Sequence, residues 1–189
     1  MTDRTRRGAI GVALTVAGAA AVARAAPTVE APGALTGHEH DWDWLVGRWN
    51  VRHHRLNGRL TGSTDWQEFS GTSMLWLTLG GLGTVDDNVI GLPDGAYRAV
   101  GVRAFDVKTG QWAIWWLDER NPVIEAPVFG GFADGGGTFM GDDTLRGRPI
   151  KVRYLWSDIG SASPRWEQAL SPDGGATWET NWVMHLTRA

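Results

Sequence analysis

Cysteine is absent from the 189 residues of this chain, which excludes disulfide bonds and metal sites built on thiolates. Stability must therefore come from packing alone. Long apolar runs are also missing, since the uncharged run near the N-terminus, residues 8–23, is too short and too weakly apolar for a stable membrane span. No nucleophile motif and no metal-binding triad is visible. The length is that of one domain of ordinary size.

Tryptophan and glycine are abundant instead, with 12 Trp and 26 Gly. Tryptophan supplies large, rigid apolar surface to strands, and glycine at this level marks many turns and bulges. The composition therefore predicts an all-β protein.

The N-terminal segment has the order of an export signal. Three arginines, including the pair Arg6 and Arg7, precede the uncharged run, and Ala23-Arg24-Ala25 follows as an Ala-x-Ala cleavage site. The arginine pair resembles the twin-arginine signal, whose machinery exports folded proteins. We therefore expect a periplasmic or secreted protein.

These features divide the chain into three parts. Residues 1–25 form the cleavable signal, residues 26–40 a flexible linker with two prolines, and residues 41–189 a single barrel domain. Removal of the signal would leave 14 basic and 20 acidic side chains, a net charge of −6. This balance argues against a nucleic-acid partner, which requires a basic face.

The sequence His38-Glu39-His40-Asp41 contains imidazole and carboxylate groups, which can bind metal ions. Adjacent residues rarely point at one metal, so we interpret the cluster as a polar lead-in in which Asp41 caps the following turn. We predict no metal site.

Alternating apolar and polar residues predict about ten short antiparallel strands, the number and spacing of an up-and-down β-barrel. On the first strand His53 shares the inner face with Trp49 and Val51. On the next strand we assign Trp66 and Glu68 to the same interior.

Later strands add further candidates for the interior. Both faces of the strand around Arg103 are apolar, so alternation alone leaves the direction of its guanidinium open. The strand 111–118 is also apolar on both sides, so one side binds something or is covered. Alternation in the last three strands places five side chains inward: Tyr154, Trp166, Gln168, Trp178 and Trp182.

Residues 171–178 fit the Asp-box pattern Ser-x-Asp-x-Gly-x-Thr-Trp of sialidase propellers and other secreted β proteins. We expect Asp173 to accept backbone N–H bonds in a closed hairpin and Trp178 to pack beneath it. The motif is structural in those families, and the chain is too short for a whole propeller.

Four short motifs occur in a characteristic order: Trp-Leu-x-Gly-x-Trp at 44–49, Gly-Ser-Thr-Asp-Trp at 62–66, Arg-Trp-Glu-Gln at 165–168 and Glu-Thr-Asn-Trp at 179–182. Together with the Asp-box they resemble a group of uncharacterised bacterial lipocalin-like proteins of the calycin superfamily, over residues 41–188. The resemblance implies a barrel with an internal ligand cavity, as in lipocalins, fatty-acid-binding proteins and the haem-binding nitrobindins.

The resemblance also implies roles for single residues. Gly47 would allow the sharp turn into the first strand, Trp49 would plug the closed end, and Arg188 would stack over its indole. Haem binding of the nitrobindin type needs an inward histidine late in the chain. His185 is late, but its alternation points outward, so we predict no cofactor.

Our leading hypothesis is an exported barrel that binds a small apolar or aromatic molecule in a tryptophan-lined cavity. Seven side chains would contact this ligand: Trp66, Arg103, Trp116, Tyr154, Trp166, Gln168 and Trp182. It remains open whether the aromatic side chains instead fill the interior completely.

Two alternatives use other features. The first is a cofactor-independent isomerase or lyase in which His53 and Glu68 form an acid-base pair and Arg103 holds an anionic group. The second is an interaction protein that uses the outer side of Trp115 and Leu117, for instance as a homodimer.

Overall fold

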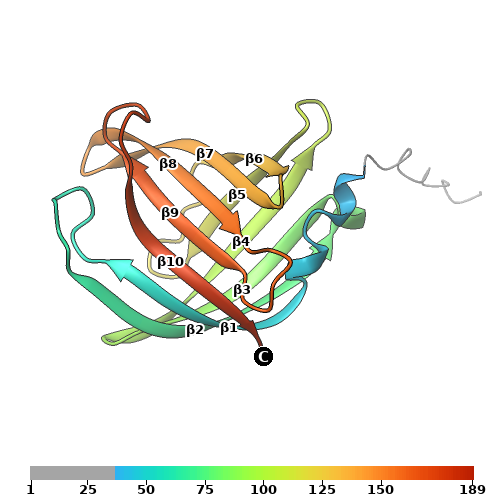
Figure 1. Ribbon diagram of the computed structural model, residues 1–189, viewed down its shortest axis with the longest axis horizontal. Coiled ribbons are helices and arrows are strands. Elements are labelled where there is room, and N and C mark those ends of the chain that lie inside the picture. Colours follow the sequence, from blue (N-terminus) through green and yellow to red (C-terminus); the bar gives the residue numbers. More distant parts are fainter. Residues whose placement is uncertain (1–36) are drawn as a thin grey trace, which may run out of the picture. The chain divides into compact units, whose positions relative to one another are not determined.

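Ten antiparallel strands close into a single barrel in the computed structural model, which describes residues 37–189 (Figure 1). The strands follow one another in chain order, and β1 pairs with β10 to close the sheet. The strands are β1 (Gly47–Leu56), β2 (Trp66–Thr78), β3 (Gly83–Leu92), β4 (Gly95–Asp106), β5 (Gln111–Asp118), β6 (Val128–Ala133), β7 (Gly136–Leu145), β8 (Arg148–Ser157), β9 (Arg165–Ser171) and β10 (Glu179–Arg188). The predicted all-β, up-and-down barrel of about ten strands is confirmed, and its shape is consistent with that of the calycins.

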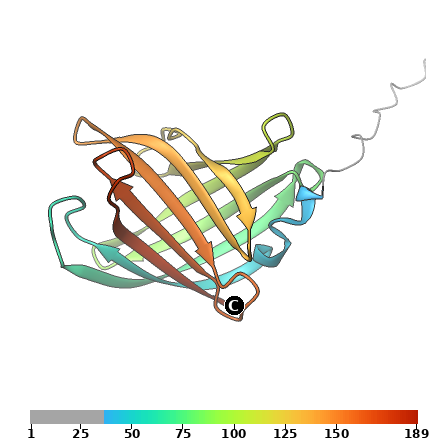
Figure 2. The same ribbon diagram turned by 45° about the horizontal axis from the view of Figure 1, so that its top comes forward.

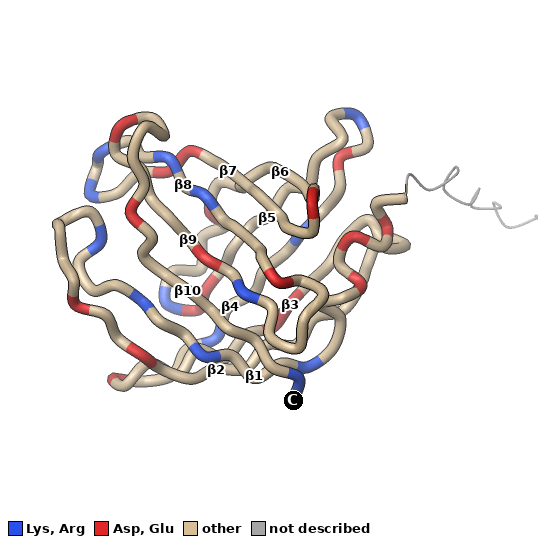
Figure 3. Tube along the Cα trace, in the orientation of Figure 1, with Lys and Arg blue, Asp and Glu red and all other residues tan. Residues whose placement is uncertain are grey.

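The described part of the chain begins with short 3₁₀ turns at one end of the barrel: η1 (His38–His40) and η2 (Asp43–Leu45), with η3 (Leu79–Gly81) between β2 and β3 (Figure 2). The expected signal at 1–25 and linker residues 26–36 lie outside the described residues. Among residues 37–189, no helix has both the length and the apolar character to cross a membrane. Positive and negative side chains are interspersed along the strands (Figure 3).

The end of the expected linker is anchored to the barrel. The ring of His38 stacks on Phe105 with centroids 4.4 Å apart, and its Nδ1 lies 2.9 Å from Oδ2 of Asp41. The same carboxylate oxygen accepts the indole N–H of Trp112 over 2.8 Å. Asp41 therefore joins the lead-in to the barrel wall through its side chain.

Aromatic side chains close this end of the barrel. Trp42 is completely buried, and its ring contacts five other aromatic rings, those of Trp44, Trp112, Phe132, Phe139 and Trp156. Trp49 is buried in the same cluster and donates its indole N–H to the carbonyl of Leu45 over 2.7 Å. The sequence predicted that Trp49 closes this end of the barrel, and in the structure Trp42 and Trp49 close it together.

Arg188 covers the plug from outside, as the resemblance implied. Its Cζ lies 3.8 Å from the centroid of the Trp49 ring. Its guanidinium also donates hydrogen bonds to the carbonyls of Val46 and Trp44, at 2.5 and 2.7 Å. Gly47, with φ of +110°, provides the sharp turn between these carbonyls and β1. The last strand therefore locks the first one in place.

The register of β1 and β2 corrects one prediction. His53 lies opposite Phe69 and His54 opposite Glu68, so the inner row of β2 contains Phe69 and Glu68 is exposed on the outer wall. Trp66 has the same outward direction and packs on His54, with ring centroids 4.5 Å apart. The inward assignment of Trp66 and Glu68 is wrong.

The start of β10 holds a second correction. Thr180 pairs with Ala169 but Trp182 pairs with Gln168, so Asn181 is an extra residue in a β-bulge. A bulge of one residue reverses the alternation between the segments on its two sides. Trp182 therefore points inward, whereas Trp178 lies on the outer wall, where Arg153 covers its ring at 4.5 Å.

The loop before β10 closes through its own hydrogen bonds. Oδ1 of Asp173 accepts the backbone N–H of Thr177 over 2.9 Å and the hydroxyl of Ser171 over 2.7 Å. The indole N–H of Trp178 donates to the carbonyl of Gly175 over 3.0 Å. Hydrogen bonds from Thr177 and Ser171 lower the pKa of Asp173 to about 2. The carboxylate is therefore the centre of this turn.

Candidate ligand-binding cavity

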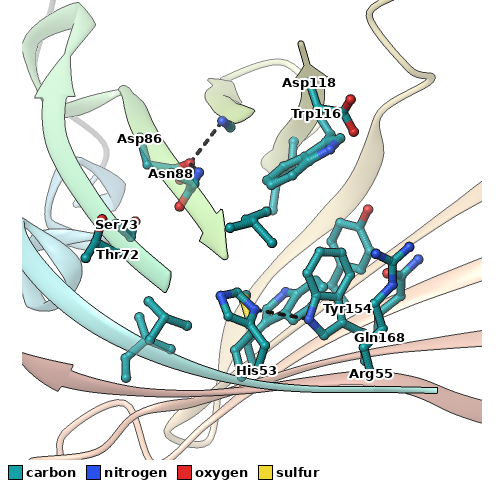
Figure 4. Close-up of a pocket in the computed structure, with 18 of the residues that line it drawn as sticks. His53, Arg55, Thr72, Ser73, Asp86, Asn88, Trp116, Asp118, Tyr154 and Gln168 are labelled. Carbon is teal, nitrogen blue, oxygen red and sulfur yellow. Dashed lines mark hydrogen bonds between the residues drawn. The ribbon is translucent and has the colours of Figure 1, made fainter. Parts of the chain in front are cut away.

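The barrel encloses a cavity of about 210 Å³ beyond the aromatic plug (Figure 4). An apolar cavity of about 150 Å³ can hold benzene, whereas pockets for drug-sized ligands measure about 300–1,000 Å³. The interior is therefore not filled by side chains alone, and its size suits a small molecule of one or two rings.

Seven of the predicted site residues border this cavity: His53, Arg103, Trp116, Tyr154, Trp166, Gln168 and Trp182. The two remaining ones, Trp66 and Glu68, lie on the outer wall and do not reach it. An acid-base pair of His53 and Glu68 is consequently not formed. His185 lies opposite Arg52 and Arg165 and does not line the cavity, in line with its expected outward direction.

His53 is the buried polar group on β1, with only 3% of its surface exposed. Its ring stacks on Phe69 at 4.8 Å, and its Nδ1 accepts the indole N–H of Trp182 over 3.2 Å. Burial lowers the pKa of His53 to about 4, and the positive charge of Arg55 acts in the same direction. The imidazole is therefore neutral at neutral pH.

One wall of the cavity is aromatic and comes from β8, β9 and β10. The ring centroids of Tyr154 and Trp166 are 5.0 Å apart, and Trp166 meets Trp182 edge to face at 5.8 Å. Burial raises the pKa of Tyr154 above its usual value, so its hydroxyl keeps its proton. Gln168 lies opposite Tyr154 in the register and adds an amide to this wall. The wall offers flat apolar surface with a few polar groups.

Arg103 points inward, which settles the direction that alternation left open. Its guanidinium forms a buried ion pair with Asp86 and donates to the hydroxyl of Thr84 over 3.2 Å. Asp86 also accepts the backbone N–H of Gly101 over 2.9 Å, and Cζ of Arg103 lies 4.6 Å from the Trp42 ring. The charge of Arg103 is thus neutralised by a neighbouring strand before any ligand is present.

The end of the cavity opposite the plug holds polar residues that we did not assign from the sequence. Arg55 follows His53 on the inner face of β1, and its Cζ lies 4.7 Å from the Trp182 ring. Cζ of Arg120 lies 3.4 Å from the centroid of the Tyr97 ring, and Nη2 of Arg120 lies 2.9 Å from Oδ2 of Asp118 in a salt bridge. Arg55 could have been found from the sequence, because it shares the alternation of His53.

The outer wall carries an apolar row across four strands. Trp76, Val85, Val102 and Trp115 lie directly opposite one another on β2 to β5. Trp76 and Val102 are 43% and 39% exposed, while Trp115 is partly buried. The interaction surface expected at Trp115 and Leu117, and a homodimer built on it, stay predictions.

No protein-family model matches this chain, and a search of curated proteins finds no similar sequence. The geometry of the cavity therefore carries the functional argument.

Proposed function

We propose that this protein is an exported, lipocalin-like barrel that binds one small apolar or aromatic molecule in its cavity. The supporting observation is the cavity of about 210 Å³ between the aromatic plug and the polar end. Its wall of Tyr154, Trp166 and Trp182 gives an aromatic ligand flat apolar surfaces, and His53 and Gln168 orient it.

Binding fits the polar groups of the cavity better than the acid-base chemistry considered from the sequence. Glu68 is outside the barrel, and Asp86 is held by Arg103 and by the backbone N–H of Gly101. The low pKa of His53 makes its imidazole a weak base. The residues near His53 therefore provide orientation rather than proton transfer.

Two further parts of the proposal come from the sequence and from the closed end. The export signal at residues 1–25 supports a periplasmic or secreted location. The arrangement of Gly47, Trp49 and Arg188 supports lipocalin-like membership, since it matches the roles that the resemblance implied.

The test is to produce the full chain with its own leader in a bacterial host and to purify it from the periplasm. Mass spectrometry under native and denaturing conditions then gives the mass of the protein with and without bound molecules. We expect a mature chain that begins at Ala26 and a native mass that exceeds the denatured mass by one small molecule.

A matched pair of variants locates the ligand. Ser73→Phe places a ring in the cavity, because Ser73 lines it, whereas Ser70→Phe places the same ring on the outer wall of β2. We expect only Ser73→Phe to lose the extra mass. Equal native and denatured masses, together with no thermal stabilisation by small aromatic compounds, would refute the proposal.

A further inference from the structure

Four arginines line the cavity, and they differ in whether a carboxylate neutralises them. Arg103 is paired with Asp86 and Arg120 with Asp118. Arg55 and Arg59 form no salt bridge with any residue in the described range 37–189. Two guanidinium groups at the polar end of the cavity are therefore not held in a salt bridge by the described residues.

Of these two, Arg55 is the one whose guanidinium packs on an aromatic side chain of the cavity wall. It lies on the inner face of β1, two residues after His53, and its guanidinium covers the ring of Trp182. Trp182 in turn binds His53 through its indole N–H (Figure 4). The guanidinium is thus held against the aromatic wall of the cavity.

The surroundings of Arg55 are unfavourable to a positive charge. Burial lowers the pKa of Arg55 from its usual value, and the charges of Arg59 and Arg120 act in the same direction, whereas Tyr97 opposes them. Asp118 is close enough to oppose this effect, but its two oxygens already accept hydrogen bonds from Arg120. Glu125 also lines the cavity and forms no salt bridge with these arginines in the described part of the chain.

We propose that the ligand is a small aromatic carboxylic acid whose carboxylate pairs with Arg55 and whose ring lies against Trp166 and Trp182. This inference rests on the proposed function, since it names the chemical class of the molecule in the same cavity. The planar guanidinium matches a carboxylate in shape and charge, and the ligand supplies a salt-bridge partner. The volume of about 210 Å³ restricts the acid to one or two rings.

The experiment compares two probes that differ only in charge, 2-naphthoate and 2-naphthamide. Their dissociation constants are measured by isothermal titration calorimetry with the mature protein and its variants, after removal of any bound molecule by refolding. We expect the unaltered protein to bind the naphthoate roughly tenfold to a hundredfold more tightly than the amide, as for a charge-assisted hydrogen-bonded pair.

Arg55→Gln should remove this preference, with the affinity for 2-naphthamide kept within about twofold. Arg55→Lys should restore part of the preference, because it keeps the charge but not the planar fork. Arg52→Gln is the matched control, since Arg52 lies on the same strand and is exposed on the outer wall. It should bind both probes as the unaltered protein does.

The outcomes separate this inference from the proposed function. If the amide binds as tightly as the naphthoate, or if Arg55→Gln keeps the preference, the proposed ligand class is wrong. The proposed function would still stand, because the cavity binds an aromatic molecule. If neither probe binds, both proposals fail. Unchanged circular dichroism of Arg55→Gln shows that a lost preference does not come from unfolding.

Discussion

The indole N–H of Trp182 donates a hydrogen bond to Nδ1 of His53 over 3.2 Å, from β10 to β1. An indole nitrogen can only donate, so Nδ1 of His53 is the acceptor and carries no proton. The proton of the neutral imidazole is therefore on Nε2. At its second ring nitrogen His53 offers a hydrogen-bond donor, which suits an acceptor group on a ligand better than it suits proton abstraction.

The low pKa of His53 predicts a pH-dependent stability. The unfolded chain takes up a proton near pH 6.5, whereas folded His53 does so only near pH 4, so stability falls as the pH is lowered between these values. We expect the free energy of unfolding in urea to fall by about 2 kcal/mol more between pH 7 and pH 5 in the unaltered protein than in His53→Gln.

His54→Gln serves as the control for this measurement, because His54 is the next residue and lies on the outer wall against Trp66. It should keep the full pH dependence. Asp173 does not interfere, since its low pKa affects stability only below about pH 4. The same slope in His53→Gln and in the unaltered protein would contradict the prediction.

Gly71 has no side chain, and the imidazole of His53 lies in the space that a side chain at this position would take. A Cβ at this position would lie 2.4 Å from the carbonyl oxygen of Val89 and 2.7 Å from Nε2 of His53. We expect Gly71→Ala to destabilise the protein by about 1–3 kcal/mol, the usual cost of overpacking. Gly131→Ala on β6, where a Cβ meets no atom within 4 Å, should cost much less. Chemical denaturation of both variants is the measurement, and equal losses would argue against this close contact.

The buried pair of Asp86 and Arg103 predicts non-additive mutations. Asp86→Leu leaves the guanidinium without its partner in the core, so we expect a loss of about 3–5 kcal/mol. The double variant Asp86→Leu/Arg103→Met removes both charges and should be less destabilised than the sum of the single variants. Urea denaturation of all four proteins gives the coupling energy. An additive result would mean that the two charges do not depend on each other.

The contacts of Arg188 predict that the end of β10 contributes to the stability of the closed end of the barrel. Arg188→Ala removes the contact with Trp49 and two hydrogen bonds to carbonyls, so we expect a loss of about 2 kcal/mol in denaturation experiments. Arg148→Ala is a suitable comparison, because Arg148 is exposed and forms no salt bridge among the described residues. Its effect should stay within about 0.5 kcal/mol. Similar losses in the two variants would show that the stacking contact adds little.

Much of the barrel was predictable because alternation is a local property of a strand. The directions of His53 and Tyr154 were predictable, because apolar and polar residues alternate along much of their strands. Trp116 lies on a strand that is apolar on both faces, and it also borders the cavity. On β2 the central residues 70–73 are small and give no contrast between the two faces. The direction of Glu68 therefore depended on the pairing of β2 with β1, which the local pattern does not contain.

The bulge at Asn181 had a similar effect on β10. One extra residue turned Trp178 outward, while Trp182 stayed inside. The amino-acid types in this segment do not predict a bulge.

By itself, the sequence determined the fold class, the approximate number of strands and the aromatic character of the barrel, because these depend on residue spacing along the chain. Only the tertiary structure decided which charges meet. Asp86 on β3 reaches Arg103 on β4, while Arg55 on β1 forms no salt bridge with a carboxylate of the described residues. The pair of Asp86 and Arg103 joins two strands, and its partners are set by the register between them.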